Sequence, residues 1–141
     1  MTRPNLFKLA SFLLPLLATS PAYGQNSKGD RARDFANGQL RELVAPSLSL
    51  SQIFAGCSLN HSSDISDAER DGMATIEQSS RELAIARLIE IVRSAPEDIR
   101  AEVAVFADGF LAGRMAIKEA PSLQHCSSTY ADILGSLTTA E

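Results

Sequence analysis

Apolar positions along this chain recur at helical intervals, and no stretch of useful length alternates in the way that a β-strand requires. The clearest series follows Pro96, at successive intervals of four, three, four, three and four residues. Such intervals place a stripe on one face of a helix, which we expect to be buried and to run to about Glu119, before Pro121. The members of the stripe are Ile99, Val103, Phe106, Phe110, Gly113 and Ile117.

The first part of the chain predicts two shorter helices. Residues 30–44 carry a modest helical pattern, which Pro46 is expected to end. Ser49 followed by Gln52 has the spacing of a capping box, in which two side chains satisfy free backbone N–H groups at a helix start. We therefore expect a separate helix over about residues 50–60.

A longer helix-prone region follows the polar segment 60–64. Ser66 and Glu69 form a second capping box. The chain from there to Ala95 predicts either one long helix interrupted near Gly72 or two helices, the second starting from Ser79 with Glu82 at its third position. Its second half is too apolar for a surface helix, so we expect it to lie centrally in the core. The apolar residues that crowd it are Leu83, Ala86, Leu88, Ile89, Ile91 and Val92.

Two further boundaries complete the pattern. Ser94, Pro96 and Glu97 predict the start of the next helix, because serine caps, proline is tolerated in the first turn and glutamate suits the third helical position. A last helix over about residues 127–137 places its apolar residues on one face. Together these elements predict an all-α fold, a small bundle of four or five helices.

The N-terminus has the layout of a secretory signal. Two basic residues precede the apolar run 9–18, which is too short for the ~20 residues that a membrane helix needs. Small residues at Ala22 and Gly24 then have the spacing that a signal peptidase recognises. We expect cleavage after residue 24, which leaves a single helical domain of residues 25–141. An N-terminal anchor helix is the alternative.

Export changes what the composition means. The chain has 141 residues, 45% of them apolar, and a net charge of −4, which becomes −6 when the signal and its two positive charges are removed. An acidic domain has no broad attraction for nucleic acid or anionic lipid, and no apolar stretch of membrane length follows the signal. We therefore expect a periplasmic or secreted protein that neither binds nucleic acid nor inserts into a membrane.

The chain contains two cysteines, Cys57 and Cys126, and export would place them in an oxidising compartment. An even pair there predicts one disulfide, which would close a loop of about 70 residues and stabilise the fold by about 4 kcal/mol in the chain-entropy model. The rival interpretation, a lipoprotein box ending at Cys57, lacks an apolar run leading into it. We expect a bridge from an early helix to a position just before the last one.

Both histidines lie next to these cysteines in sequence. His61 is four residues after Cys57, and His125 directly precedes Cys126. A bridge would bring both imidazoles near the same sulfurs, where protonation at about pH 6.5 would make them repel each other and form a pH-sensitive patch. The alternatives are two exposed histidines beside a bridge and, in a reducing compartment, a zinc site. We expect no metal.

Gly109 and Gly113 lie one helical turn apart in the same predicted helix. Interior glycine costs a helix about 1 kcal/mol relative to alanine, so such a pair indicates that another backbone approaches closely. We expect close packing against an early helix, with a ligand groove as the alternative.

Motifs of known catalytic classes are missing from the sequence. It contains no Gly-rich phosphate loop, no HExxH, no GxSxG and no specific carboxylate pair. We expect neither an enzyme nor a cofactor.

One stretch carries a resemblance to known families. Residues 106–113, Phe-Ala-Asp-Gly-Phe-Leu-Ala-Gly, stand ahead of the second cysteine in a small exported helical domain. This layout resembles the HdeA-type periplasmic acid-stress chaperones. In its Gly-Phe-x-x-Gly motif, followed by Cys126 and a final helix, the chain is also similar to Tai-type periplasmic immunity proteins. The resemblance covers residues 50–138.

The resemblances imply protein binding in two different forms. The chaperone type implies a protein that loosens at low pH and holds unfolded clients without ATP. The immunity type implies a preformed surface for one specific envelope protein, a toxin or a hydrolase. An accessory role in an envelope secretion machine is a third alternative. The apolar client-binding surface of a chaperone would be formed by Leu83, Leu88, Ile91, Phe106 and Phe110.

Overall fold

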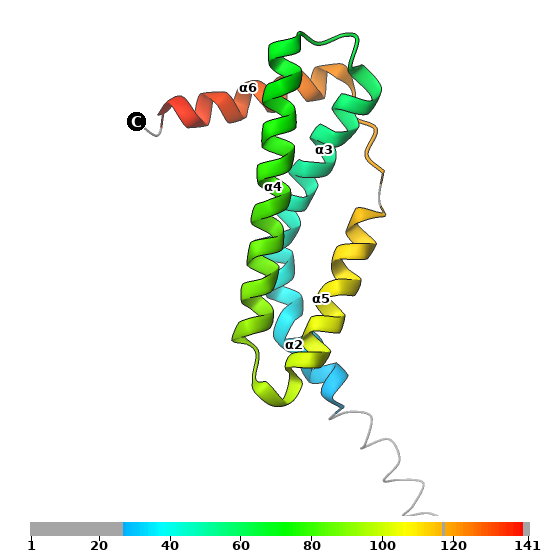
Figure 1. Cartoon of the computed structure of the whole chain (residues 1–141), viewed down its shortest axis with the longest axis vertical. Coiled ribbons are helices and arrows are strands. Elements are labelled where there is room, and N and C mark those ends of the chain that lie inside the picture. The colour runs from blue at the N-terminus through cyan, green and yellow to red at the C-terminus, as the bar shows by residue number, and fades with distance from the viewer. Residues whose placement is uncertain (1–26, 117, 140–141) are drawn as a thin grey trace, which may run out of the picture.

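The computed structural model describes residues 27–116 and 118–139, which are almost entirely helical (Figure 1). In chain order the elements are α2 (Lys28–Gln39), the π-helical turn η1 (Leu40–Val44), α3 (Ala45–His61), α4 (Asp67–Ser94), the 3-10 turn η2 (Glu97–Ile99), α5 (Arg100–Met115) and α6 (Leu123–Thr139). These residues contain no strand, so the expected all-α bundle is confirmed. None of these helices combines the length and the apolarity that crossing a membrane requires. The expected signal, residues 1–24, lies outside the described part of the chain.

The first helix does not end at Pro46, contrary to the sequence prediction. α2, η1 and α3 follow one another without a break, and Ser49 and Gln52 lie inside the helix rather than at its start. In η1 the N–H of Ala45 donates to the carbonyl of Leu40, which spans one residue more than an α-helical hydrogen bond. Pro46 then occupies the first turn of α3, where its missing N–H and fixed φ are tolerated.

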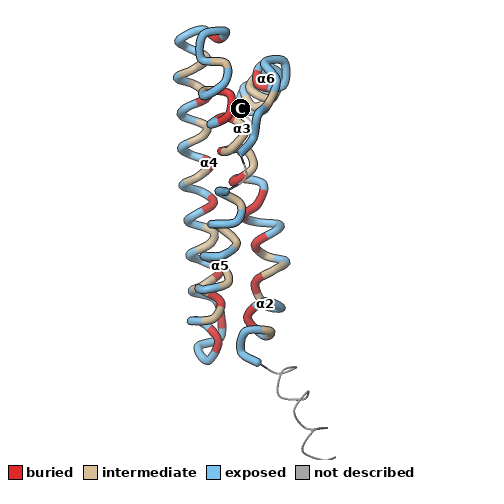
Figure 2. The backbone as a smooth tube through the Cα atoms, turned by 90° about the vertical axis from the view of Figure 1, so that its right-hand side faces the viewer, coloured by how far each residue is buried: buried red, intermediate tan, exposed pale blue. Residues whose placement is uncertain are grey.

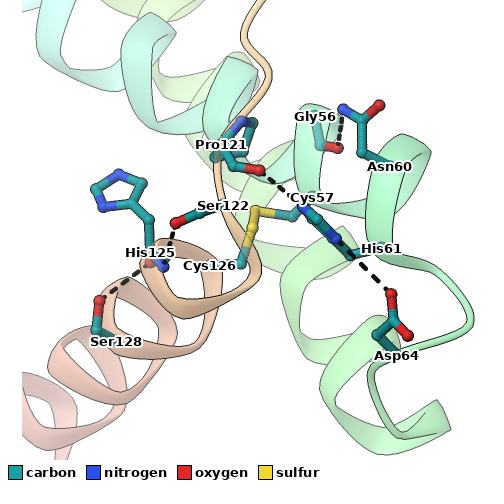
Figure 3. Close-up of a disulfide and its surroundings, with 10 residues drawn as sticks. All are labelled: Gly56, Cys57, Asn60, His61, Asp64, Pro121, Ser122, His125, Cys126 and Ser128. Atoms are coloured by element: carbon teal, nitrogen blue, oxygen red, sulfur yellow. Dashed lines mark hydrogen bonds and ion pairs between the residues drawn. A yellow bond between two sulfur atoms is a disulfide. The ribbon is translucent and has the colours of Figure 1, made fainter.

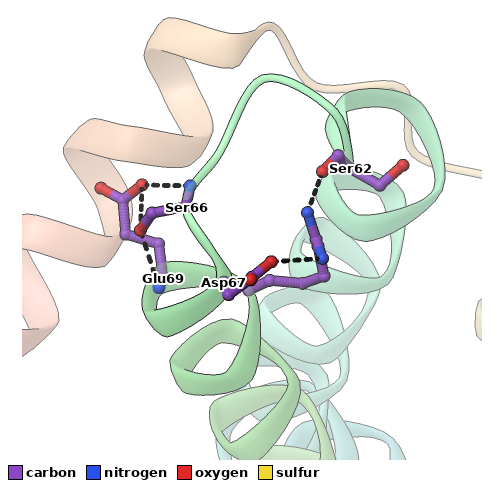
Figure 4. A network of polar contacts seen from close by, with 5 residues as sticks. Ser62, Ser66, Asp67 and Glu69 are labelled. Atoms are coloured by element: carbon purple, nitrogen blue, oxygen red, sulfur yellow. Dashed lines mark hydrogen bonds and ion pairs between the residues drawn. The ribbon is translucent and has the colours of Figure 1, made fainter.

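α4 is one uninterrupted helix, and Gly72 lies inside it. The helix begins at the predicted capping box (Figure 4). The backbone N–H of Glu69 donates to the hydroxyl of Ser66 (3.2 Å), and the backbone N–H of Ser66 donates to the carboxylate of Glu69 (3.1 Å). The local signal was therefore sufficient to define this helix start.

The apolar second half of α4 does not lie centrally in the core. Leu83 is 45% exposed and Ile89 is 41% exposed. The prediction was wrong because the second half of α4 has neighbours along one side only, namely α3 and η1, with α5 near its C-terminal end (Figure 1). Its buried residues form one stripe, comprising Met73, Ser80, Ala84 and Ile91.

The boundary between α4 and α5 differs in detail from the prediction. Ser94 is the last residue of α4, and its hydroxyl donates to the carbonyl of Ile91 instead of capping the next helix. The chain turns at Pro96, passes through η2 and continues as α5 to Met115, ending before the predicted Glu119.

The stripe predicted for α5 is buried in its first part only. Its first four members are buried or half-buried, whereas Gly113 is exposed and Ile117 lies outside the described residues. Ala107, one position after a predicted member, completes the buried row. The first four members are Ile99, Val103, Phe106 and Phe110.

The buried side chains form two separate clusters, which follow the inner faces of the helices (Figure 2). The first core lies where α2, η1, α4 and α5 meet, and it consists of Ala32, Ala36, Leu40, Val44, Leu48, Ala84, Ile91, Ala95, Ile99, Val103 and Ala107. The second core lies at the other end of the bundle, where α3, the start of α4 and α6 meet, and it consists of Phe54, Cys57, Ile65, Met73 and Cys126. The cysteines therefore belong to one end of the molecule.

Gly109 and Gly113 do not mark a close approach of another backbone. A Cβ built on either glycine would meet nothing within 4 Å, so the expected close packing is wrong. Both residues are exposed, because α5 turns its opposite face, with Val103 and Ala107, toward the first core.

Two other glycines do make tight contacts. A Cβ on Gly56 would lie 2.6 Å from the carbonyl oxygen of Glu119, and one on Gly72 would lie 2.8 Å from Cζ of Tyr130. Both contacts are made by the linker or helix that follows α5, so they hold the C-terminal part of the chain against α3 and α4.

We expect Gly109→Ala and Gly113→Ala each to raise the free energy of unfolding by about 0.5–1 kcal/mol, because alanine favours the helix and meets no obstacle. Gly56→Ala should lower it by about 1–3 kcal/mol, because the blocking atom belongs to the backbone and cannot rotate away. Urea unfolding followed by circular dichroism measures both effects. A stabilised Gly56→Ala variant would contradict this account.

Candidate functional site

A disulfide joins α3 to α6 inside the second core (Figure 3). Cys57 and Cys126 form the predicted bond, with 5.9 Å between their Cα atoms, and both residues are fully buried. In the same cluster the ring of Phe54 meets the ring of Tyr130 edge-on, with 6.4 Å between the centroids. The bond therefore lies in a closed apolar environment rather than at a reactive surface.

The segment that leads into α6 is held beside this bond. Nε2 of His61, the last residue of α3, lies 2.7 Å from the carbonyl oxygen of Pro121. Because a carbonyl oxygen only accepts, Nε2 carries the hydrogen in this contact. Nδ1 of the same ring lies 3.8 Å from Oδ2 of Asp64. His61 thus links the end of α3 to the α5–α6 linker.

The two histidines do not form one patch. His125 lies in the first turn of α6 and is exposed, and its ring points away from the disulfide and from His61 (Figure 3). The bridge brings both residues into one region, as expected, but their imidazoles do not face each other. Repulsion between the two rings therefore has no geometric basis in the folded protein.

The zinc alternative does not fit the described residues. Residues 27–116 and 118–139 contain no group of three or more His, Cys, Asp or Glu side chains placed to hold a metal ion. The disulfide also removes the two thiolates that a site of two cysteines and two histidines would need. The arrangement of Cys57 and Cys126 is structural.

The predicted client-binding residues do not form one open surface in the folded protein. Ile91 is 3% exposed and belongs to the first core. Leu88, Phe106 and Phe110 are half-buried and pack against that core, and Leu83 alone is exposed. Four of the five residues therefore pack in or against the first core and do not form an exposed surface.

Sequence reasoning missed an apolar groove between the start of α2 and the start of α5. Val105 stands in it with 74% of its surface exposed. The signal was present in the sequence, because Val105 is a large apolar residue that lies off the buried stripe of its own helix. The groove has a volume of about 350 Å³ and is lined by Gly29, Arg33, Ala101, Glu102, Val105 and Phe106.

An ion pair joins α2 to η2 at this end of the molecule. Nη1 of Arg31 donates to Oδ2 of Asp98 at 2.8 Å, and both side chains are about half exposed. The hydrogen bond from Arg31, aided by its positive charge, lowers the pKa of Asp98 below its ordinary value. This carboxylate is therefore bound more strongly in its ionised form than in its protonated form.

Comparisons of the chain with protein-family models, with curated proteins and with solved structures find no significant match.

We expect Cys57→Ala combined with Cys126→Ala to lower the free energy of unfolding by about 4 kcal/mol, because the unfolded chain regains the entropy of an open loop. The loss should be local in the native state, since α6 packs mainly on α3 and on the second core. Urea unfolding measures the first effect, and amide hydrogen exchange measures the second. If amide exchange accelerated equally in α2 and α6, the prediction that the loss of native-state stability is confined to α6 would be refuted.

Proposed function

We propose that the chain is an exported protein-binding protein that acts as an ATP-independent chaperone for proteins unfolded by acid. The observation that carries the proposal is the division of the interior into a cross-linked second core and a first core without a covalent tie. Opening the first core would expose apolar surface while the disulfide holds the other end together. The candidate residues that this opening would release are Leu88, Ile91, Phe106 and Phe110.

Acid would open the first core through charge. Protonation of all carboxylates takes the mature chain from a net charge of −6 to +13, termini aside, when both histidines are also charged. Mutual repulsion of like charges destabilises a compact fold and keeps the opened chain soluble. The function would require binding alone, without catalysis, a nucleotide or a cofactor.

The Arg31–Asp98 ion pair adds a specific contribution of the same sign. Because the pKa of Asp98 is lowered in the folded protein, the pair stabilises the fold at pH values above the unfolded-state pKa. That stabilisation is lost as the pH falls through the folded-state pKa. The contact joins α2 to η2, so its loss weakens the end of the bundle that holds the first core.

A second function is favoured by a different observation, the apolar side chains that are exposed while the protein is folded. Val105 is 74% exposed beside the α2–α5 groove, and Leu59 is 81% exposed on α3. Preformed apolar surface suits a binder of one folded partner, such as an immunity protein or an inhibitor of an envelope toxin or hydrolase. Such a binder would keep its fold when it binds.

We expect the purified protein to lower the light scattering of an aggregation-prone client at about pH 2.5, where carboxylates are protonated, and to have no such effect at neutral pH. Leu88→Ser and Phe110→Ser should weaken the suppression, because these side chains pack against the first core. Leu59→Ser, on an exposed position of α3, is the matched control and should act like the unaltered protein.

Two outcomes would count against the chaperone. The chaperone proposal would be overturned if the protein did not lower the light scattering of the client in acid and its helical circular dichroism signal stayed unchanged there. A single stoichiometric partner bound at neutral pH, with no effect on clients in acid, would favour the immunity or inhibitor class.

We expect Asp98→Asn to lower the free energy of unfolding at pH 7 and to differ less and less from the unaltered protein as the pH falls below 3.8, the ordinary pKa of the carboxyl group. Protonation removes the ion pair from the unaltered protein in that range, so both chains then lack it. Urea unfolding at a series of pH values measures the difference. Asp108→Asn, an exposed substitution on α5, is the control. A difference that stays constant down to pH 2 would show that the ion pair does not matter.

A further inference from the structure

The second half of α6 leaves the bundle. The helix is seated on the second core through Cys126, Tyr130 and Ile133, and beyond them it runs past α4 and projects from the molecule (Figure 1). On this projecting part Leu134 is 43% exposed and Leu137 is 63% exposed. An apolar face thus continues past the point at which the rest of the chain covers it.

The apolar side of α6 has the pattern of a helix that binds in a groove. Tyr130, Ile133, Leu134 and Leu137 stand at positions i, i+3, i+4 and i+7 and therefore share one side of α6. Tyr130 and Ile133 pack on the second core, and Leu134 and Leu137 continue the same side where it is exposed. Amphipathic helices use this set of positions as anchors when they enter an apolar groove of another protein. Asp132 is the one charged residue of the segment 131–139, and its position falls on the opposite side of the helix.

The molecule is acidic where this helix crosses it. The ring of Tyr130 lies against the backbone of Gly72, which places α6 beside the start of α4. The one basic side chain in residues 62–72, Arg70, is bound to Asp67 at 2.9 Å and donates to the carbonyl of Ser62 (Figure 4). α6 itself contains neither lysine nor arginine. The exposed carboxylates of this region are Asp64, Asp67 and Asp71.

We propose that Leu134 and Leu137, together with the acidic start of α4 that Tyr130 of the same helix contacts, form a docking surface for a basic partner protein whose apolar groove receives α6. Charge selects this partner. A groove bordered by lysine or arginine complements the carboxylates, whereas a second copy of this acidic chain or an anionic lipid surface would bring like charge.

The docking surface lies at the disulfide-linked end of the bundle, away from the first core, and it is present in the folded protein. It therefore acts at neutral pH, at which the proposed chaperone would be closed. The inference goes beyond the proposed function and does not depend on it, because either one can fail without the other.

The test uses the full protein with its disulfide formed, immobilised at neutral pH and exposed to the basic proteins of an extract of the source cells, retained on a cation exchanger. We expect one protein to bind in stoichiometric amount. Leu134→Ser combined with Leu137→Ser should weaken its binding at least about 10-fold, since exposed anchor residues carry most of such an interface. Raising the salt from about 50 to about 500 mM should also weaken binding, because the carboxylates are solvated.

Controls separate docking from folding and from other partners. The double serine variant should keep the helical signal and the melting temperature, because both leucines are exposed. Ile89→Ser, a substitution of an exposed residue on the second half of α4, should bind as the unaltered protein does. Four results would overturn the proposal. The first two are retention of no protein from the basic fraction and equal retention by the double variant. The others are a dimer in sedimentation equilibrium that the double variant abolishes and flotation of the protein with phosphatidylglycerol vesicles.

Discussion

The disulfide between Cys57 and Cys126 is the constraint on which the rest of the arrangement depends. α6 follows a segment, residues 118–122, that is not helical, and it packs mainly on α3, so little apolar contact holds it in place apart from the cross-linked second core. The bond closes a loop that contains all of α4 and α5, which removes entropy from the unfolded chain. His61 and Gly56 hold the linker at the same place, one through the carbonyl of Pro121 and the other by lacking a Cβ.

This constraint makes the two ends of the bundle different. At one end a covalent bond fixes α6 and leaves its second half projecting with exposed leucines. At the other end α2 and α5 are held by small and branched apolar residues and by one half-exposed ion pair, Arg31–Asp98. The acid-opened client surface and the docking surface at neutral pH that we propose can therefore occupy the same small chain, because they use different ends and different states of it.

The differences between the sequence predictions and the structure have a common physical cause. Pro46, Ser49 and Gln52 carry local signals for a helix end and a helix start, yet the burial of Leu40 and Val44 in the first core accompanies a π-helical turn that lets the helix continue. Gly109 and Gly113 have the spacing of a packing motif, but whether a neighbour lies opposite a glycine is not a local property. The capping box at Ser66 was predicted correctly because all its atoms lie within one turn.

The sequence by itself determined the all-α class, the start of α4 and the pairing of the two cysteines, because helical periodicity, capping and a single pair of thiols each leave one solution. Only the tertiary structure decided which apolar residues are covered. Leu83 and Leu137 are as apolar as Leu40 and Leu48, but a helix has neighbours on some sides only, and the disulfide sets where α6 crosses and how much of it projects. Which sides of each helix have neighbours and how far α6 projects together define the candidate binding surfaces, since exposure depends on contacts between segments far apart in the chain.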